Sequence, residues 1–341
     1  MRFVPKKLES YIPHGHCNDE LPMDWQSFFT RILMNVLKRI YGRSQGNAWS
    51  SVQDVLPYDE SVDFIRQRLL SKEPFMAGKI GTGDMETLQR YIDMISGSCL
   101  LKKWLRLIAG KSFPFWFDNW IRAGICVCAG VFPATDDSIK EFCRIFMSYC
   151  DAFDAIPKYT EGDKRIYNEL CPTAKVIDLR ALAPDLPNTW CSALEGKKVL
   201  VVHQYEKTIR SQYEKNVEFH KGQGPLPRFK ELIQYKPVNS IGGKCKDFAC
   251  WKDALQHMID DISKIDFDVA LLGCGVYGVP LSAHIKRMGK QAIYTGGATQ
   301  IIFGIKGKRW DNLGIYNEHW VRPSLEDIPE NMEKIEGGCF I

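Results

Sequence analysis

The sequence predicts an α/β protein with a Rossmann-like, mostly parallel sheet flanked by helices, and with an α-helical extension at the N-terminus. Three consecutive features predict the sheet. An almost wholly apolar run at 267–272 is typical of a strand buried on both faces of a parallel sheet. Glycines in GxGxxG spacing follow it and lead into an amphipathic helical pattern at 280–290. A second apolar run at 291–294 completes a strand–turn–helix–strand unit. We also expect a parallel strand at 198–203 and a strand over the apolar run at 125–132.

The glycine turn of this unit predicts a site for a phosphate-bearing ligand. Gly273, Gly275 and Gly278 allow backbone N–H groups and a helix N-terminus to approach a phosphate. A dinucleotide site would also place Asp or Glu about 20 residues past the glycines, to hold the ribose. Here that position falls at 295–297, and no carboxylate lies between Gly273 and Asp311. We therefore expect a phosphate-bearing ligand other than NAD; a turn that only packs strand against helix is the alternative.

The length of 341 residues allows one large or two medium domains. We expect an N-terminal helical extension at 1–60 and a Rossmann-like domain at 61–341, which could divide into two lobes near 157–187. Hydrophobic residues make up 45% of the chain and charged residues 25%, which is ordinary for a globular protein. The net charge of +4, without a long basic tract, does not indicate a nucleic-acid partner.

The cysteines and the N-terminus predict a cytoplasmic location. The twelve cysteines are scattered, and the first residues lack the apolar core of a signal peptide, so we expect reduced thiols. No uncharged run reaches the roughly 18 residues of a membrane span. We expect no transmembrane segment.

Two basic, apolar segments allow membrane contact. Residues 24–43 predict an amphipathic helix, capped by Asp24, whose remaining charges are all basic. Such a helix can lie at the periphery of an anionic membrane, and docking on the protein's own core is the alternative. Residues 98–120 are aromatic and basic; we expect buried core there rather than a rim facing a membrane or an acceptor.

A second strand–turn–helix motif predicts a metal site. A strand at 76–80 leads into the turn Gly81-Thr82-Gly83, and a helix is expected to start at Asp84. At such a turn Asp84 and Glu86 can converge on one ligand, and Mg²⁺ or Mn²⁺ bound to a diphosphate prefers oxygen donors of this kind. Helix capping by Asp84, with Glu86 complementing the helix dipole, is the alternative interpretation.

These motifs resemble those of GT-D-type glycosyltransferases. The turn at 81–86 (GTGDME) is similar to their GDGE turn, whose DxE motif serves metal and nucleotide-sugar binding. Segments 129–142, 194–213 and 267–310 and the EGGCFI tail resemble uncharacterised proteins of surface-polysaccharide gene clusters. In two departures, Lys79 stands in place of the usual Arg before the turn, and Met85 replaces the second glycine of GDGE.

The resemblance implies metal-assisted sugar transfer, with inversion, from a nucleoside-diphosphate sugar such as a UDP-sugar to a glycan or glycolipid acceptor. Asp84 and Glu86 would hold Mn²⁺ or Mg²⁺ as the cofactor. The general base is left open among His203, Glu206 and Asp311. The residues expected at the nucleotide sugar are Gly81, Thr82, Gly83, Gly273, Gly275, Tyr277, Gly278, Gly296, Gly297, Gln300, Lys306 and Arg309.

Two other functions fit parts of the sequence. The string at 271–275 (LLGCG) resembles the glycine turn of AdoMet-dependent methyltransferases, but the acidic residue that such a site needs after the next strand is missing. The chain could also be a non-catalytic scaffold of glycan assembly that uses its basic N-terminal helix. Binding of a nucleoside diphosphate, of AdoMet, or of neither distinguishes the three.

Overall fold

The computed structural model describes residues 32–33, 36, 48, 50–160, 162–182, 189–335 and 337–341. Most of the predicted extension at 1–60, and most of the predicted helix at 24–43, therefore lie outside the described residues. No helix in the described part of the chain combines the length and the apolar composition that crossing a bilayer requires.

The described chain forms an α/β fold around one sheet of seven parallel strands, in the order β3-β2-β1-β7-β6-β4-β5. The strands are β1 (Phe75–Gly78), β2 (Ala155–Pro157), β3 (Lys175–Ile177), β4 (Lys198–His203), β5 (Glu231–Tyr235), β6 (Val269–Gly273) and β7 (Gln291–Tyr294). The predicted α/β class with a parallel sheet is confirmed. Strands from both sides of 157–187 belong to this one sheet, so those residues do not separate two sheets.

The strands are apolar at successive positions because both faces of the sheet are covered. In β6, Ala270 and Leu272 face one hydrophobic cluster, while Val269 and Leu271 face the other. Alternate side chains of a strand point to opposite faces, so a run without polar residues requires helices on both sides.

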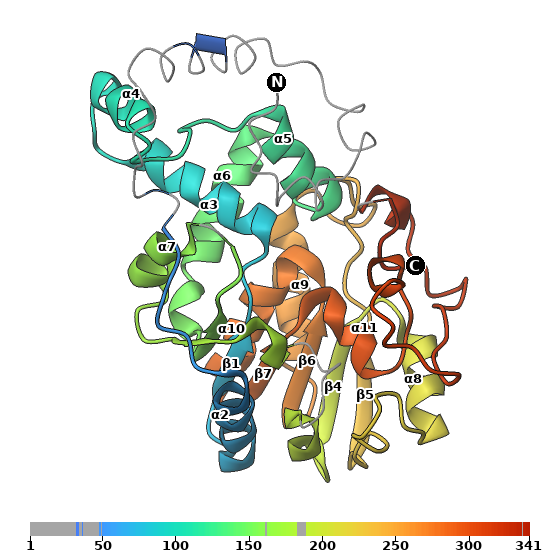
Figure 1. Ribbon diagram of the computed structural model, residues 1–341. Helices are drawn as coiled ribbons and strands as arrows, with labels where there is room; N and C mark the ends of the chain where they lie inside the picture. The colour runs from blue at the N-terminus through green and yellow to red at the C-terminus, as the bar shows by residue number, and fades with distance from the viewer. Residues whose placement is uncertain are drawn as a thin grey trace.

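Helices pack on both faces (Figure 1). One face is covered by α3 (Thr82–Ile95), α6 (Asp136–Met147), α7 (Asp163–Leu170), α9 (Trp251–Ile262) and α10 (Gly278–Arg287). The other face is covered by α2 (Tyr58–Ser71), α8 (Glu206–Lys215) and C-terminal residues that include Phe303 and Met332. The remaining helices are α4 (Leu100–Ile108), α5 (Asn119–Arg122) and α11 (Thr299–Ile302).

Three expectations about local structure were wrong or incomplete. The strand-like run at 125–132 is instead a π-helix, Ala123–Cys128, followed by a turn. Short apolar runs in a buried helix and in a buried strand cannot be told apart by periodicity. The short strand β2 and the half-buried strand β5 were not predicted. The segment at 98–120 is not wholly core, since Leu100, Leu101 and Leu105 of α4 are exposed.

The strand order creates one topological switch point. The chain leaves β4 toward β5 on one side, whereas it leaves β6 toward β7 on the other. The connections after these two neighbouring strands diverge, so a crevice opens at their carboxyl ends, where ligands of open α/β sheets bind. The strand β5, which the sequence did not predict, is what creates this switch point.

Candidate active site

A cavity of about 290 Å³ lies at the carboxyl edge of the sheet. Its wall contains residues at or just beyond the carboxyl ends of five strands. They are 81–83 beyond β1, 203–205 at the end of β4, 237–241 beyond β5, 273–275 at the end of β6 and 296–297 beyond β7. The two glycine turns that stood out in the sequence, at 81–83 and at 273–275, therefore open into the same cavity.

The three glycines after β6 serve different purposes. A Cβ at Gly273 would lie 2.5 Å from the His203 ring, and a Cβ at Gly278 would lie 2.1 Å from the Tyr294 ring. At Gly275 the nearest atom would be 3.5 Å away, but φ is +57°, in the left-handed region. Gly273 and Gly278 thus permit close packing, while Gly275 permits the turn whose backbone lies on the cavity wall. Gly278 itself is not on that wall.

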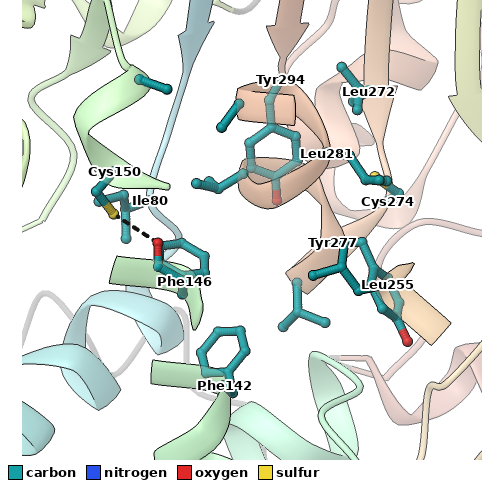
Figure 2. Packing of buried hydrophobic residues seen from close by; sticks show 14 of the residues in the cluster. Ile80, Phe142, Phe146, Cys150, Leu255, Leu272, Cys274, Tyr277, Leu281 and Tyr294 are labelled. Atoms are coloured by element: carbon teal, nitrogen blue, oxygen red, sulfur yellow. Dashed lines mark hydrogen bonds between the residues drawn. The ribbon is translucent and has the colours of Figure 1, made fainter. Parts of the chain in front are cut away.

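Two buried tyrosines hold this turn in place. The Tyr294 hydroxyl at the end of β7 donates to the Gly275 carbonyl at 2.9 Å. The Tyr277 hydroxyl pairs with Ser240 at 2.8 Å, and its ring stacks on Trp251. Figure 2 shows Tyr277 and Tyr294 among the buried side chains of this core. The turn is therefore built on packed core, which favours a preorganised ligand site.

The turn after β1 presents the N-terminus of a long helix to the cavity. The helix α3 begins at Thr82, and its N-cap, Gly81, has no side chain with which to cap the helix. Gly81, Thr82 and Gly83 all line the cavity. The first N–H groups of a helix lack partners within it and carry its positive dipole end, so this wall favours a negatively charged group.

Asp84 lies beneath this turn rather than on the cavity wall. Asp84 is 7% exposed, and its carboxylate accepts a hydrogen bond from the Gly81 N–H at 3.3 Å. Burial raises the pKa of Asp84 to about 7, while the Gly81 hydrogen bond and the nearby Lys79 oppose the rise. This geometry matches the capping alternative for Asp84.

Glu86 lies two residues further along α3 and points elsewhere. Burial raises the pKa of Glu86, with Arg90 and Trp120 opposing the rise and Asp118 adding to it. The two carboxylates do not converge because the helix starts at Thr82, before Asp84, and helical side chains two positions apart do not face each other.

The fit of these residues to Mn²⁺ or Mg²⁺ is therefore poor in this conformation. Asp84 and Glu86 do not supply two oxygen donors to one ion, and Asp84 already binds its own helix. Within the described ranges, no group of three or more His, Cys, Asp or Glu residues is arranged to hold a metal ion. No step of the chemistry below is assigned to a metal.

Two cations stand on the cavity wall instead. Lys79 follows β1, and its Nζ lies 4.7 Å from the centre of the Tyr159 ring. The Arg309 guanidinium lies 4.7 Å from the centre of the Phe340 ring. The described residues that line the cavity include no Asp or Glu. Aromatic faces hold the cations in position, and the two cations give the described part of this wall a positive charge that suits an anion.

His203, at the end of β4, contributes a hydrogen-bond donor. It is 6% exposed, and its Nδ1 accepts from the Tyr205 N–H at 3.1 Å. Burial lowers the pKa of His203 to about 4, so the ring is neutral at pH 7 and carries its proton on Nε2. Among the described residues, no hydrogen-bond partner of Nε2 is found. A neutral ring in this state can donate to a ligand through Nε2–H, and the lowered pKa of His203 disfavours the role of general base that the sequence left open.

The other two candidate bases lie away from the cavity wall. Asp311 is exposed and pairs with Arg322 at 2.8 Å, which lowers its pKa. Glu206 is half-buried at the start of α8.

Gln300 and Lys306 were both predicted to bind the nucleotide sugar, and the structure separates them. Gln300 lies on the wall, but its amide Nε2 donates to the carbonyls of Ile305, Lys306 and Phe340. It therefore anchors the C-terminal segment that carries Phe340. Lys306 lies outside the wall, with its Nζ 5.4 Å from the centre of the Tyr316 ring.

The cavity thus brings together most of the predicted binding residues and none of the predicted carboxylates. The predicted residues on its wall are Gly81, Thr82, Gly83, His203, Gly273, Gly275, Tyr277, Gly296, Gly297, Gln300 and Arg309. Those outside the wall are Asp84, Glu86, Glu206, Gly278, Lys306 and Asp311. Residues that the predicted set missed include Lys79, Tyr159, Gln204, 237–241 and Phe340. The sequence could have identified Lys79 as a ligand-binding residue, because it is a cation close before a glycine turn. It could not have identified 237–241, because these residues follow β5, a strand that the sequence pattern did not predict.

Comparison of the chain with family models, with curated proteins and with solved structures found no match.

Proposed function

We propose that the chain is a glycosyltransferase that binds a nucleoside-diphosphate sugar, such as a UDP-sugar, in the carboxyl-edge cavity and transfers the sugar to a glycan or glycolipid acceptor. One observation carries the proposal. The cavity combines a helix N-terminus, a glycine turn and the cations Lys79 and Arg309, and the described wall has no carboxylate. A diphosphate is the ligand that these groups complement. The sequence resemblance to GT-D-type enzymes supports the choice of a sugar as the group transferred.

The same groups can assist bond cleavage. When the bond between the anomeric carbon and the diphosphate oxygen breaks, its electron pair stays on that oxygen and negative charge builds on the leaving group. Lys79, Arg309 and the N–H groups of Thr82 and Gly83 are positioned by the fold before the ligand arrives. Groups fixed in advance stabilise developing charge without reorganisation, which is the main source of electrostatic catalysis.

His203 adds a neutral donor to this set. Its Nε2–H can donate to a phosphate or sugar oxygen, and its low pKa keeps it from competing for the acceptor's proton. The acceptor hydroxyl must still lose a proton on transfer. Glu206 and Asp311 stay predictions for this role, although neither lies on the described wall. Mn²⁺ or Mg²⁺ likewise stays a prediction, which the experiment below tests.

The experiment measures the melting temperature of the full chain with UDP, GDP, a UDP-sugar or AdoMet, each with Mn²⁺ and with EDTA. A ligand that binds only the folded state raises the melting temperature. We expect a nucleoside diphosphate to raise it in EDTA, because the cations on the wall belong to the protein itself. A rise that needs Mn²⁺ would support the metal prediction. A rise with AdoMet alone, or with none of the four, would reject the proposal.

A matched pair of variants connects such binding to this cavity. Lys79→Met removes a cation from the wall, whereas Lys306→Met removes one that the sequence also favoured but that lies outside it. We expect the first variant to lose most of the rise and the second to keep it. Equal effects would place the nucleotide elsewhere. Sugar transfer itself is then measured by release of the nucleoside diphosphate in the presence of glycan acceptors.

A further inference from the structure

The helix α4 presents an exposed apolar face. Leu101 and Leu105, one helical turn apart, are 68% and 57% exposed. Leu100 beside them is 64% exposed, and Ile95, near the end of α3, is 56% exposed. Figure 1 shows α4 projecting beyond α3, away from the sheet. Single exposed leucines are common on protein surfaces, whereas apolar side chains grouped on one helix face are typical of a surface that contacts another molecule.

The helix is held firmly with this face outward. Leu107, on its inner side, is buried. The Trp104 ring packs against Phe115 and Trp116, with ring centres 5.3 Å and 5.7 Å away. Lys103 Nζ donates to the Met94 carbonyl at 2.6 Å. The leucines therefore cannot turn inward without breaking these contacts.

The charged residues of α4 and of the segment that follows it are all basic. Lys102 and Arg106 are exposed and one turn apart, so they form a basic edge beside Leu101 and Leu105. Lys111 is exposed just after the helix, and no Asp or Glu occurs between residues 96 and 117. An apolar stripe flanked by cations is the pattern of a helix that lies in the headgroup layer of a membrane.

We infer that α4 docks the protein on an anionic lipid bilayer, with Leu101 and Leu105 inserted and Lys102 and Arg106 at the headgroups. Two other partners for this face, the segment 24–43 and a second copy of the chain, are disfavoured by their charge. The segment 24–43 is basic apart from Asp24, and a second copy would bring the same basic edge, so either would meet like charge. An anionic bilayer offers both an apolar layer and the opposite charge. This inference stands independently of the proposed function.

The test is co-sedimentation of the full chain with vesicles. One set is phosphatidylcholine alone, and the other contains about 30% phosphatidylglycerol, an anionic lipid. We expect binding to the anionic vesicles only, weakened by raising the salt from about 0.1 M to about 0.5 M. We expect a loss of about tenfold or more for Leu101→Gln with Leu105→Gln, and a similar loss for Lys102→Gln with Arg106→Gln.

Leu70→Gln is the matched control, because Leu70 is 60% exposed on α2. It should bind vesicles as the wild type does, and all variants should keep the wild-type melting temperature to within a few degrees. Absence of wild-type binding to anionic vesicles would overturn the inference. So would full binding by the double leucine variant, which would assign the contact to another segment such as 24–43. A wild-type dimer that the double leucine variant abolishes would assign the face to a second copy instead.

Discussion

Replacing Asp84 by Asn tests whether its carboxylate is a buried helix cap or a ligand for a metal ion. Asn keeps an oxygen that can accept from the Gly81 N–H but can no longer ionise. In the wild type, burial raises the pKa of Asp84 from 3.8 to about 7. Because the pKa is raised in the folded state, the stability that the protonated carboxyl contributes is complete below about pH 4 and is lost as the pH rises through about 7.

The size of the effect follows from these two pKa values. The interval between them corresponds to about 4 kcal/mol of unfolding free energy, as an upper limit. Between about pH 4 and about pH 8 the wild type should therefore lose up to about 4 kcal/mol of unfolding free energy that Asp84→Asn does not lose. Burying the extra amide N–H groups of Asn costs about 1–3 kcal/mol at every pH, so the change with pH is the informative quantity.

The assay is urea denaturation of both proteins across this pH range, with unfolding free energies extrapolated to water. Asp137→Asn is the control, because it replaces a carboxylate by an amide on a side chain that is 92% exposed. A stability difference between Asp84→Asn and the wild type that stays constant with pH would refute the reasoning, since the buried carboxylate would then ionise at its ordinary pKa. If Mn²⁺ also stabilised the wild type but not the variant, the metal-binding interpretation of Asp84 would replace the capping one.

Three further outcomes are expected. Lys79→Met should weaken nucleoside-diphosphate binding about tenfold or more in titration calorimetry, while Lys306→Met should leave it unchanged. Gly278→Ala should lower the unfolding free energy by about 1–3 kcal/mol, because its methyl group would meet the tyrosine ring that ends β7; Gly83→Ala, with open space around it, should cost far less. The lowered pKa of His203 should cost the wild type stability as the pH falls from about 6.5 to about 4, and His203→Gln should remove that loss.

Each of these three has a result that contradicts it. Equal affinity of the two lysine variants for the nucleoside diphosphate would show that the diphosphate does not bind at the turn after β1. Equal stability of the two glycine variants would mean that the β7 tyrosine can yield, so that the close approach at Gly278 is not required. A His203 imidazole NMR signal that titrates near pH 6.5 would show a ring that is ionised more easily than its burial allows.

Local sequence was sufficient for the elements that combine strong patterns. The strands β4 and β7 match their predicted bounds, and β1, β6 and α10 lie within a few residues of theirs. An apolar run that ends at a glycine and is followed by a helical pattern can be assigned as a strand from the sequence alone. The strands β2 and β5 escaped prediction because the first has three residues and the second is only half-buried, so neither produces a long apolar run.

The glycine turns at 81–83 and 273–275 could be recognised from the chain alone, because turn chemistry depends on neighbouring residues. Which side chains reach the ligand was decided only by the tertiary structure. Parallel strands end at one edge, so residues as distant in the chain as Lys79 and Arg309 line the same cavity. Because α3 begins at Thr82 rather than at Asp84, the Asp84 side chain lies beneath the turn and not on the cavity wall. Sequence patterns cannot locate the start of a helix to within one or two residues, so this orientation could not be predicted.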